Sequence, residues 1–239
     1  MASEHAAWNP AAEFELTQLA PDIWIARHPL SFFGFRMTTC MTVVRLPSGG
    51  VWLHSPIPLQ GGLKAAVDAL GPVQFVVAPN RLHHLYALAA MEQYPQARLF
   101  VAPGLTDKNP AFAPHPPLPE AAVAPWADSI DAVFVAGNSE LNETVFFHRP
   151  SRTLVITDLA VFLGSWDAFA TRLYARINGC YNRFGHSFLL RRFFRDVPAA
   201  RRSVQAMLEW PIERIVMAHG PVLRRDARAR LREAFAWLL

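Results

Sequence analysis

Three short stretches of the sequence carry side chains suited to chemistry, and each follows an apolar run that predicts a buried strand. They are His83 and His84 after residues 74–78, Asp158 after residues 153–157, and His219 after residues 214–218. Imidazole and carboxylate groups carry protons and bind metals. Strand ends hold such groups rigidly while the adjoining loops expose them, so active-site residues of layered α/β proteins often lie there. A single polar residue after a strand has a simpler explanation, since Asp158 could bind loop amides.

The elements that must position these side chains alternate between strand-like and helix-like patterns. The predicted strands are 23–26, 41–46, 51–54, 74–78, 98–102, 130–135, 144–148, 153–157 and 214–218, and the predicted helices are 62–70, 81–93, 199–209 and 226 to the end. Two halves that each begin with sheet and end with helix indicate an α/β sandwich of two sheets with helices outside. Residues 103–127 hold seven prolines and are expected to form a long surface loop.

The same three stretches resemble motifs of the metallo-beta-lactamase fold superfamily. Residues 75–84 are similar to the strand and loop that carry its His-x-His-x-Asp-His motif, residues 153–158 to the hairpin that ends in a bridging Asp, and residues 215–220 to the late strand that ends in His-Gly. Residues 52–57 and 142–148 resemble an uncharacterised bacterial branch known as a domain of unknown function. The resemblance implies a four-layer αββα sandwich spanning about residues 20–225.

The chain departs from this superfamily at several ligand positions. If His84 is the last histidine of the motif, then Pro79, Arg81 and His83 replace three of its earlier members, and residues 137–143 lack the usual Gly-His ligand. The early strand that usually ends in Asp is followed here by His54-Ser55-Pro56, and the sequence does not say whether His54 approaches the same cleft. The resemblance therefore implies one reduced, mononuclear site with His84, Asp158 and His219 as metal ligands.

Two imidazoles, one carboxylate and an open position are typical of a catalytic zinc site, and the same set can hold iron. Such an ion brings the pKa of a bound water towards about 7 and polarises a carbonyl or phosphoryl oxygen. Glu143 or His83 would then serve as the catalytic proton carrier, and Asn80 or Asn142 would orient an imidazole. Because adjacent side chains on a helix point about 100° apart, only one of His83 and His84 is expected to face the ion.

Amino-acid composition narrows the class of protein to which the chain can belong. Of 239 residues, 52% are hydrophobic and 18% charged, which indicates one globular domain over residues 1–239 and excludes a disordered chain. No apolar run is long enough to cross a membrane, and the leader, residues 1–20, has no secretion signal, so the expected location is the cytoplasm. Cys40 and Cys180 are too few for a disulfide framework and are expected to be buried thiols.

The charge is uneven, because residues 151–239 hold 15 Lys and Arg against 7 Asp and Glu. Arginines alternate with aromatic residues between Arg172 and Arg202, a pattern that a nucleic-acid surface shares with solvated helices, a pocket wall or a dimer contact. No nucleic-acid module is present in the sequence, so a small-molecule substrate or ligand is the expected partner.

Two functions remain open from the sequence. One is a metal-dependent hydrolase with one zinc or iron ion, whose substrate would be chosen largely by residues 103–127 and 164–195. The other is a catalytically silent relative with no metal, which keeps the sandwich as a binding or regulatory module. Whether the chain is an enzyme, what its substrate is and how many copies associate stay undecided, because fold-level similarity does not transfer reactions.

Overall fold

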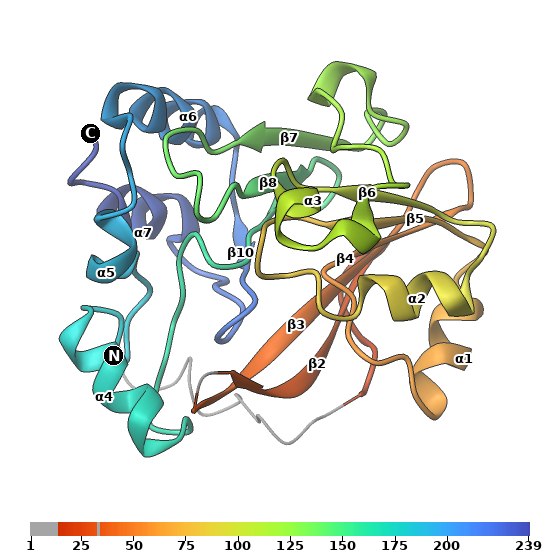
Figure 1. Ribbon diagram of the computed structural model, residues 1–239, viewed down its shortest axis with the longest axis horizontal. Helices are drawn as coiled ribbons and strands as arrows, with labels where there is room; N and C mark the ends of the chain where they lie inside the picture. The colour runs from red at the N-terminus through yellow and green to blue at the C-terminus, as the bar shows by residue number, and fades with distance from the viewer. Residues whose placement is uncertain (1–13, 33) are drawn as a thin grey trace.

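The computed structural model describes residues 14–32 and 34–239, and it has two β-sheets packed face to face with helices on both outer faces (Figure 1). This is the predicted αββα sandwich. Residues 1–13 of the predicted leader lie outside the described residues, whereas Thr17–Ala20 form a short strand, β1, that the sequence pattern did not predict. Within the described residues, no helix has the length and apolar character needed to cross a membrane.

The first sheet has six strands in chain order, β1 to β6. They are β1 (Thr17–Ala20), β2 (Ile23–Phe32), β3 (Phe35–Arg45), β4 (Val51–His54), β5 (Val73–Ala78) and β6 (Arg98–Val101). The first four pair antiparallel, whereas β4, β5 and β6 run parallel because helices connect them. The β2–β3 hairpin is much longer than predicted and projects beyond the other strands (Figure 1).

The second sheet has four strands in the order β10-β9-β8-β7. They are β7 (Ile130–Phe134), β8 (Thr144–His148), β9 (Thr153–Val155) and β10 (Arg214–Val216). The β7–β8 and β8–β9 pairs are antiparallel, and β10 returns parallel to β9. This parallel pairing places the residues that follow β9 and β10 at the same edge of the sheet.

Helices cover the outer faces of both sheets (Figure 1). Those of the first half are α1 (Gly62–Asp68), α2 (Ala87–Gln93) and α3 (Leu105–Lys108), and those of the second half are α4 (Phe169–Ile177), α5 (Phe188–Arg191), α6 (Val197–Glu209) and α7 (Ala227–Ala234). Leu63 and Val67 of α1 lie one helical turn apart and pack on the six-stranded sheet. Val204 of α6 and Leu231 of α7 pack in the same way on the four-stranded sheet.

Large aromatic side chains fill the space between the two sheets. Trp52 of β4 is fully buried and meets Phe146 of β8 edge to face, with ring centroids 5.1 Å apart. Trp126 completes this core, although it lies in the proline-rich stretch that was expected to run along the surface. That stretch also contains α3 and two short 3-10 helices, Pro110–Phe112 and Ala121–Val123. Both cysteines are buried and unpaired by disulfides, as expected.

The predicted helix 81–93 is too long at its start, because α2 begins only at Ala87. The side-chain oxygen of Asn80 accepts the backbone N–H groups of Leu82 and His83, at 2.8 and 2.6 Å. An Asn that binds the backbone two and three residues ahead stabilises a turn and offers those amides an alternative to helix hydrogen bonds. The histidines at 83 and 84 therefore lie on a turn, and the sequence-based argument about their directions does not apply.

Buried neutral histidines predict acid sensitivity of the fold. Burial among aromatic rings lowers the pKa of His186 to about 4, and its ring stacks on that of Trp237. An unfolded chain takes up this proton below about pH 6.5, whereas the folded chain does so only near pH 4. The stability that a neutral His186 contributes is therefore fully present above about pH 6.5 and is lost as the pH drops towards 4. At pH 5 this residue alone lowers the free energy of unfolding by about 2 kcal/mol relative to its value at neutral pH.

Denaturant unfolding of wild type and His186→Phe between pH 7.5 and 5 measures this contribution. The variant keeps a ring against Trp237 but takes up no proton, so we expect it to lose less stability on acidification than wild type does. An equal pH slope in the two proteins would contradict a neutral His186.

Candidate metal site

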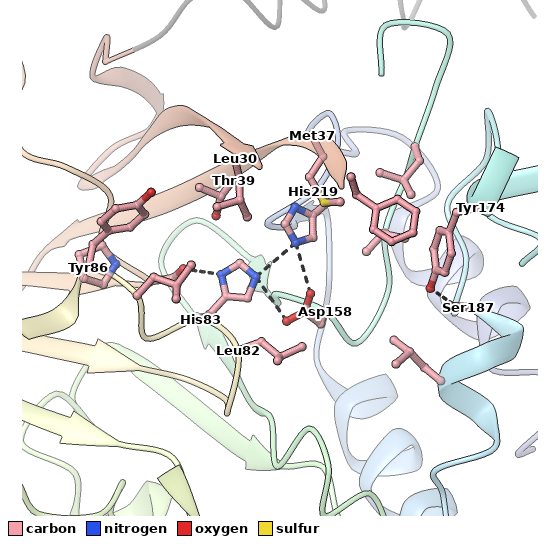
Figure 2. A pocket seen from close by; sticks show the side chains of 17 residues that line it. Leu30, Met37, Thr39, Leu82, His83, Tyr86, Asp158, Tyr174, Ser187 and His219 are labelled. Atoms are coloured by element: carbon pink, nitrogen blue, oxygen red, sulfur yellow. Dashed lines mark hydrogen bonds and ion pairs between the residues drawn. The ribbon is translucent and has the colours of Figure 1, made fainter. Parts of the chain in front are cut away.

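The loops after β5, β9 and β10 bring His83, Asp158 and His219 together at one end of the sandwich (Figure 2). His83 Nε2 lies 3.3 Å from Asp158 Oδ2, and His219 Nε2 lies 3.3 Å from Asp158 Oδ1. The two Nε2 atoms are themselves 3.3 Å apart. In the part of the chain that the structure describes, no other group of three or more His, Cys, Asp and Glu side chains is so arranged.

The far nitrogen of each imidazole is held by a neighbouring strand. His219 Nδ1 lies 2.7 Å from the backbone oxygen of Thr38 on β3, and since a carbonyl only accepts, this nitrogen carries the proton. His83 Nδ1 lies 2.7 Å from the hydroxyl oxygen of Ser55, directly after β4. Contacts of this kind fix the ring orientation and leave Nε2 free to act as a ligand.

Asn80 joins the first loop to the second. While its side-chain oxygen stabilises the turn before His83, its amide nitrogen donates to Asp158 Oδ2 at 2.8 Å and to the Thr157 hydroxyl at 2.9 Å. One buried side chain thus sets the position of both an imidazole and the carboxylate that faces it. Asn80 was expected to orient an imidazole ring, but its side chain contacts the carboxylate of Asp158 and the backbone N–H of His83 instead.

Glu143 lies behind Asp158 and is almost fully buried. Its carboxylate accepts the backbone N–H groups of Thr157, Asp158 and Leu159 at 2.6 to 2.9 Å, and an N–H of the Asn80 amide at 3.1 Å. Burial and the charge of Asp158 raise the pKa of Glu143 to about 7. A carboxylate that binds three successive amides shapes the loop after β9, and it does not line the cavity described below.

The electrostatics of the group favour an ionised carboxylate. Burial by itself raises the pKa of Asp158, but the adjoining His83 and His219 outweigh burial and hold that pKa well below its usual value. Burial opposes charge on His219 as well, yet the hydrogen bond that this imidazole donates to Asp158 raises its pKa. A negative charge held between two nitrogen ligands is what a divalent cation requires.

The residues present fit a zinc-sized ion. A tetrahedral ion with bonds of about 2.0–2.1 Å has ligand atoms about 3.3–3.4 Å apart. The two Nε2 atoms are 3.3 Å apart, and each lies 3.3 Å from a different oxygen of Asp158. With one donor atom taken from each residue, all three atoms lie within 4.8 Å of one another. Two nitrogens and a carboxylate also form the donor set that catalytic zinc and non-haem iron sites use.

The structure places His83, and not His84, beside Asp158 and His219, contrary to the arrangement that the sequence suggested. His83, expected to carry protons, faces Asp158 and His219, whereas His84, expected to be a ligand, is not in the group. The His84 ring instead contacts Phe112 edge to face, with centroids 5.3 Å apart, and burial lowers its pKa to about 4. The physical reason is the turn at Asn80, which directs the first of the two imidazoles towards β9 and β10.

Other candidate residues also lie away from the site. His54 is buried between the sheets against Trp52 and Phe146, and it does not line the cavity. Asn142 donates to the backbone oxygen of Pro103 and touches neither imidazole. Sequence reasoning missed the anchors Ser55 and Thr38. The position of Ser55 after a strand was the only available signal, since Thr38 contributes a backbone oxygen that any residue would offer.

A cavity of about 230 Å³ opens beside the three residues (Figure 2). Its walls come from the β2–β3 hairpin, the turn 82–86, the segment after β9, α4 and α5. Segment 164–195, which was expected to influence the choice of substrate, contributes Tyr174, Ser187 and Leu190 to the lining. Residues 103–127 contribute none of the lining, so the expectation that this stretch shapes the pocket is not met, because Phe112 and Trp126 direct it into the core.

Solved structures with the same fold are metallo-beta-lactamases. The enzyme from Pontibacter korlensis superposes with a TM-score of 0.62 at 12% identity, covering 93% of this chain and 98% of its own. The metallo-beta-lactamase from Erythrobacter litoralis superposes with a TM-score of 0.61 at 16% identity, covering 93% of this chain and 96% of its own. The metallo-beta-lactamase FIM-1 from Pseudomonas aeruginosa, in its mono-zinc form, superposes with a TM-score of 0.60 at 12% identity, covering 97% of this chain and 100% of its own. At such low identity these likenesses establish the fold alone, which is the predicted metallo-beta-lactamase fold.

A comparison with curated proteins finds no match. Residues 21–167 match a family described as a domain of unknown function, DUF4336. This match agrees with the resemblance noted for residues 52–57 and 142–148, and it covers more than half of the 239 residues. The chain therefore belongs to the DUF4336 family and has the metallo-beta-lactamase fold.

Proposed function

We propose that this protein is a metal-dependent hydrolase with a single ion held by His83, Asp158 and His219. The observation that carries the proposal is the mutual spacing of 3.3 Å among two Nε2 atoms and the Asp158 carboxylate, with both rings fixed through Nδ1. When bound, zinc would lower the pKa of a coordinated water to about 7 and polarise the bond to be cleaved. The partner is then a small-molecule substrate.

The chain itself supplies orientation and charge balance. Ser55 and the Thr38 carbonyl keep each Nε2 directed at the open side of the group, and Asn80 and Glu143 keep Asp158 in place. Asp158, with one carboxylate oxygen facing each imidazole and its pKa held well below the usual value, would stay ionised and balance the charge of the ion. Glu143 acts as a positioning residue.

The silent binding module is the second candidate, and one contact favours it. The Nε2 atoms of His83 and His219 lie within hydrogen-bonding distance, so one protonated imidazole could bridge to the other while Asp158 balances the charge. The three residues would then satisfy one another without an ion. The arginine-rich segment favours neither function, because Arg176 lies over the ring of Tyr181 and Arg191 over that of Trp237, so the chain itself occupies these aromatic faces.

Metal loading tests the hydrolase against the module. We expect the purified protein to bind about one equivalent of zinc or iron, to melt at a higher temperature when loaded, and to hydrolyse members of a panel of carboxylic esters, thioesters and phosphodiesters. Asp158→Asn keeps the shape and hydrogen-bonding reach of the side chain but removes its charge, and it should lose both the ion and the activity. A folded wild type that binds no zinc, iron or manganese would establish the silent module.

A further inference from the structure

The cavity beside the three residues has no cationic wall. Seventeen residues line it, and none of them is Lys or Arg. Arg81, in the loop after β5, donates to the backbone oxygen of Ser139, and Lys108 donates to that of Arg81, so both are engaged outside the cavity lining. Pockets for carboxylates and phosphates use Arg or Lys side chains to offset the lost hydration of the anion. A substrate with such a group beyond the reacting bond does not fit here.

Most of the lining is apolar and comes from several separate elements. Leu30 and Met37 are a cross-strand pair on the β2–β3 hairpin, Val161 and Leu163 follow β9, and Leu190 lies on α5. The ionisable groups near neutral pH in the lining are the imidazoles of His83 and His219 and the carboxylate of Asp158 (Figure 2), and its other polar residues are hydroxyl-bearing: Thr39, Ser55, Tyr86, Tyr174 and Ser187. A pocket of this kind buries an apolar group and fixes one polar bond next to it.

The polar residues of the cavity also limit which group can leave the carbonyl carbon of a substrate. Among the residues that line the cavity, every carboxylate and imidazole belongs to the three-residue group. The Tyr174 hydroxyl lies 2.8 Å from Ser187, and burial raises the pKa of this phenol. An amine must be protonated before it leaves a carbonyl carbon, so amide cleavage needs a separate acid near neutral pKa, whereas an alkoxide leaves more readily.

We propose that the substrate is an uncharged carboxylic ester whose acyl group lies in this apolar cavity. The inference rests on the proposed hydrolase. In the reaction the oxygen of water bonds to the carbonyl carbon, and the bond from this carbon to the ester oxygen breaks. The departing alcohol takes one proton, and the carboxylate product and a second proton are released.

Binding to the metal-free chain tests the cavity separately from catalysis. The probe is octanamide, a neutral eight-carbon acyl compound, titrated calorimetrically, with octanoate as its charged counterpart. Leu190→Asp places a charge in the lining, and Leu189→Asp places the same charge on the adjacent, exposed residue of α5, which does not line the cavity. We expect octanamide to bind wild type and Leu189→Asp equally, and at least tenfold more weakly to Leu190→Asp, with octanoate weaker than octanamide on wild type. Leu85→Asp, at a half-exposed lining residue, repeats the test if Leu190→Asp does not fold.

Zinc-loaded protein then tests the reaction. p-Nitrophenyl hexanoate should be hydrolysed at least tenfold faster than bis(p-nitrophenyl) phosphate, and Leu190→Asp should raise KM for the ester. No octanamide binding, or equal binding to Leu189→Asp and Leu190→Asp, would overturn the apolar cavity. Octanamide binding without any zinc-dependent hydrolysis would overturn the hydrolase and leave a site for neutral apolar ligands. Hydrolysis of the phosphodiester in preference to the ester would leave the hydrolase standing and overturn the substrate class.

Discussion

His83→Ala should abolish stable zinc binding, whereas His84→Ala should leave it almost unchanged. His83 Nε2 is one of the proposed ligand atoms and lies 3.3 Å from both His219 Nε2 and Asp158 Oδ2, while the His84 ring packs against Phe112 outside the group. Loss of a residue that merely supports a ligand costs about 10- to 100-fold in metal affinity, so loss of a ligand itself should exceed 100-fold. Mass-spectrometric metal content and a competition titration with a zinc chelator measure the difference.

The adjacent pair provides its own control, because both variants remove one imidazole from the same turn. Ser55→Ala adds an intermediate case, since it removes the partner of His83 Nδ1 and keeps the ligand, and a loss of about tenfold is expected. Zinc retained in His83→Ala but lost in His84→Ala would restore the assignment that the superfamily resemblance implied. If both variants lose zinc, circular dichroism shows whether they are still folded. If they are unfolded, His83→Gln replaces His83→Ala.

The adjacent histidines also show how far sequence reasoning reached. The three loops were found because each chemical group follows an apolar run, and the order of strands in a sandwich brings such ends to one edge. Which imidazole faces the others depends on a turn of a few residues. Asn80 closes that turn with a side chain, a local choice that hydrophobic periodicity does not record, so the pattern predicted a helix from residue 81 instead.

The burial of individual side chains is the other property that could not be predicted from the sequence. Glu143 was a candidate proton carrier because a carboxylate within hydrogen-bond reach of a bound water can take its proton, but the structure surrounds it with backbone amides and places it behind Asp158. The proline-rich residues 103–127 were expected on the surface because of their composition, yet Phe112 and Trp126 are fully buried. In both cases the surroundings come from residues distant in sequence, which propensity and spacing do not identify.

The contacts of Glu143 link the stability of the fold to the geometry of the site. Glu143 lies in the loop before β8, and its carboxylate binds both the backbone amides after β9 and the side-chain amide of Asn80. Asn80 in turn stabilises the turn that carries His83. A buried charge that satisfies several donors is costly to alter, because each donor left unpaired loses about 1–3 kcal/mol. A change at this residue should therefore affect folding and metal binding together, and chemistry only through them.

We expect Glu143→Gln to lower the free energy of unfolding by about 2–4 kcal/mol and to weaken zinc binding by about 10- to 100-fold. Both oxygens of Glu143 accept N–H groups, so the amide nitrogen of Gln must face at least one backbone donor whichever way it turns. Denaturant unfolding and zinc titration at pH 8, above the pKa of about 7, compare the variants with the carboxylate ionised. Glu140→Gln, an exposed residue of the same loop, is the matched control and should change neither quantity. If Glu143 were instead the proton carrier, its variant would keep stability and zinc affinity and lose only kcat, with one limb of the pH–rate profile removed.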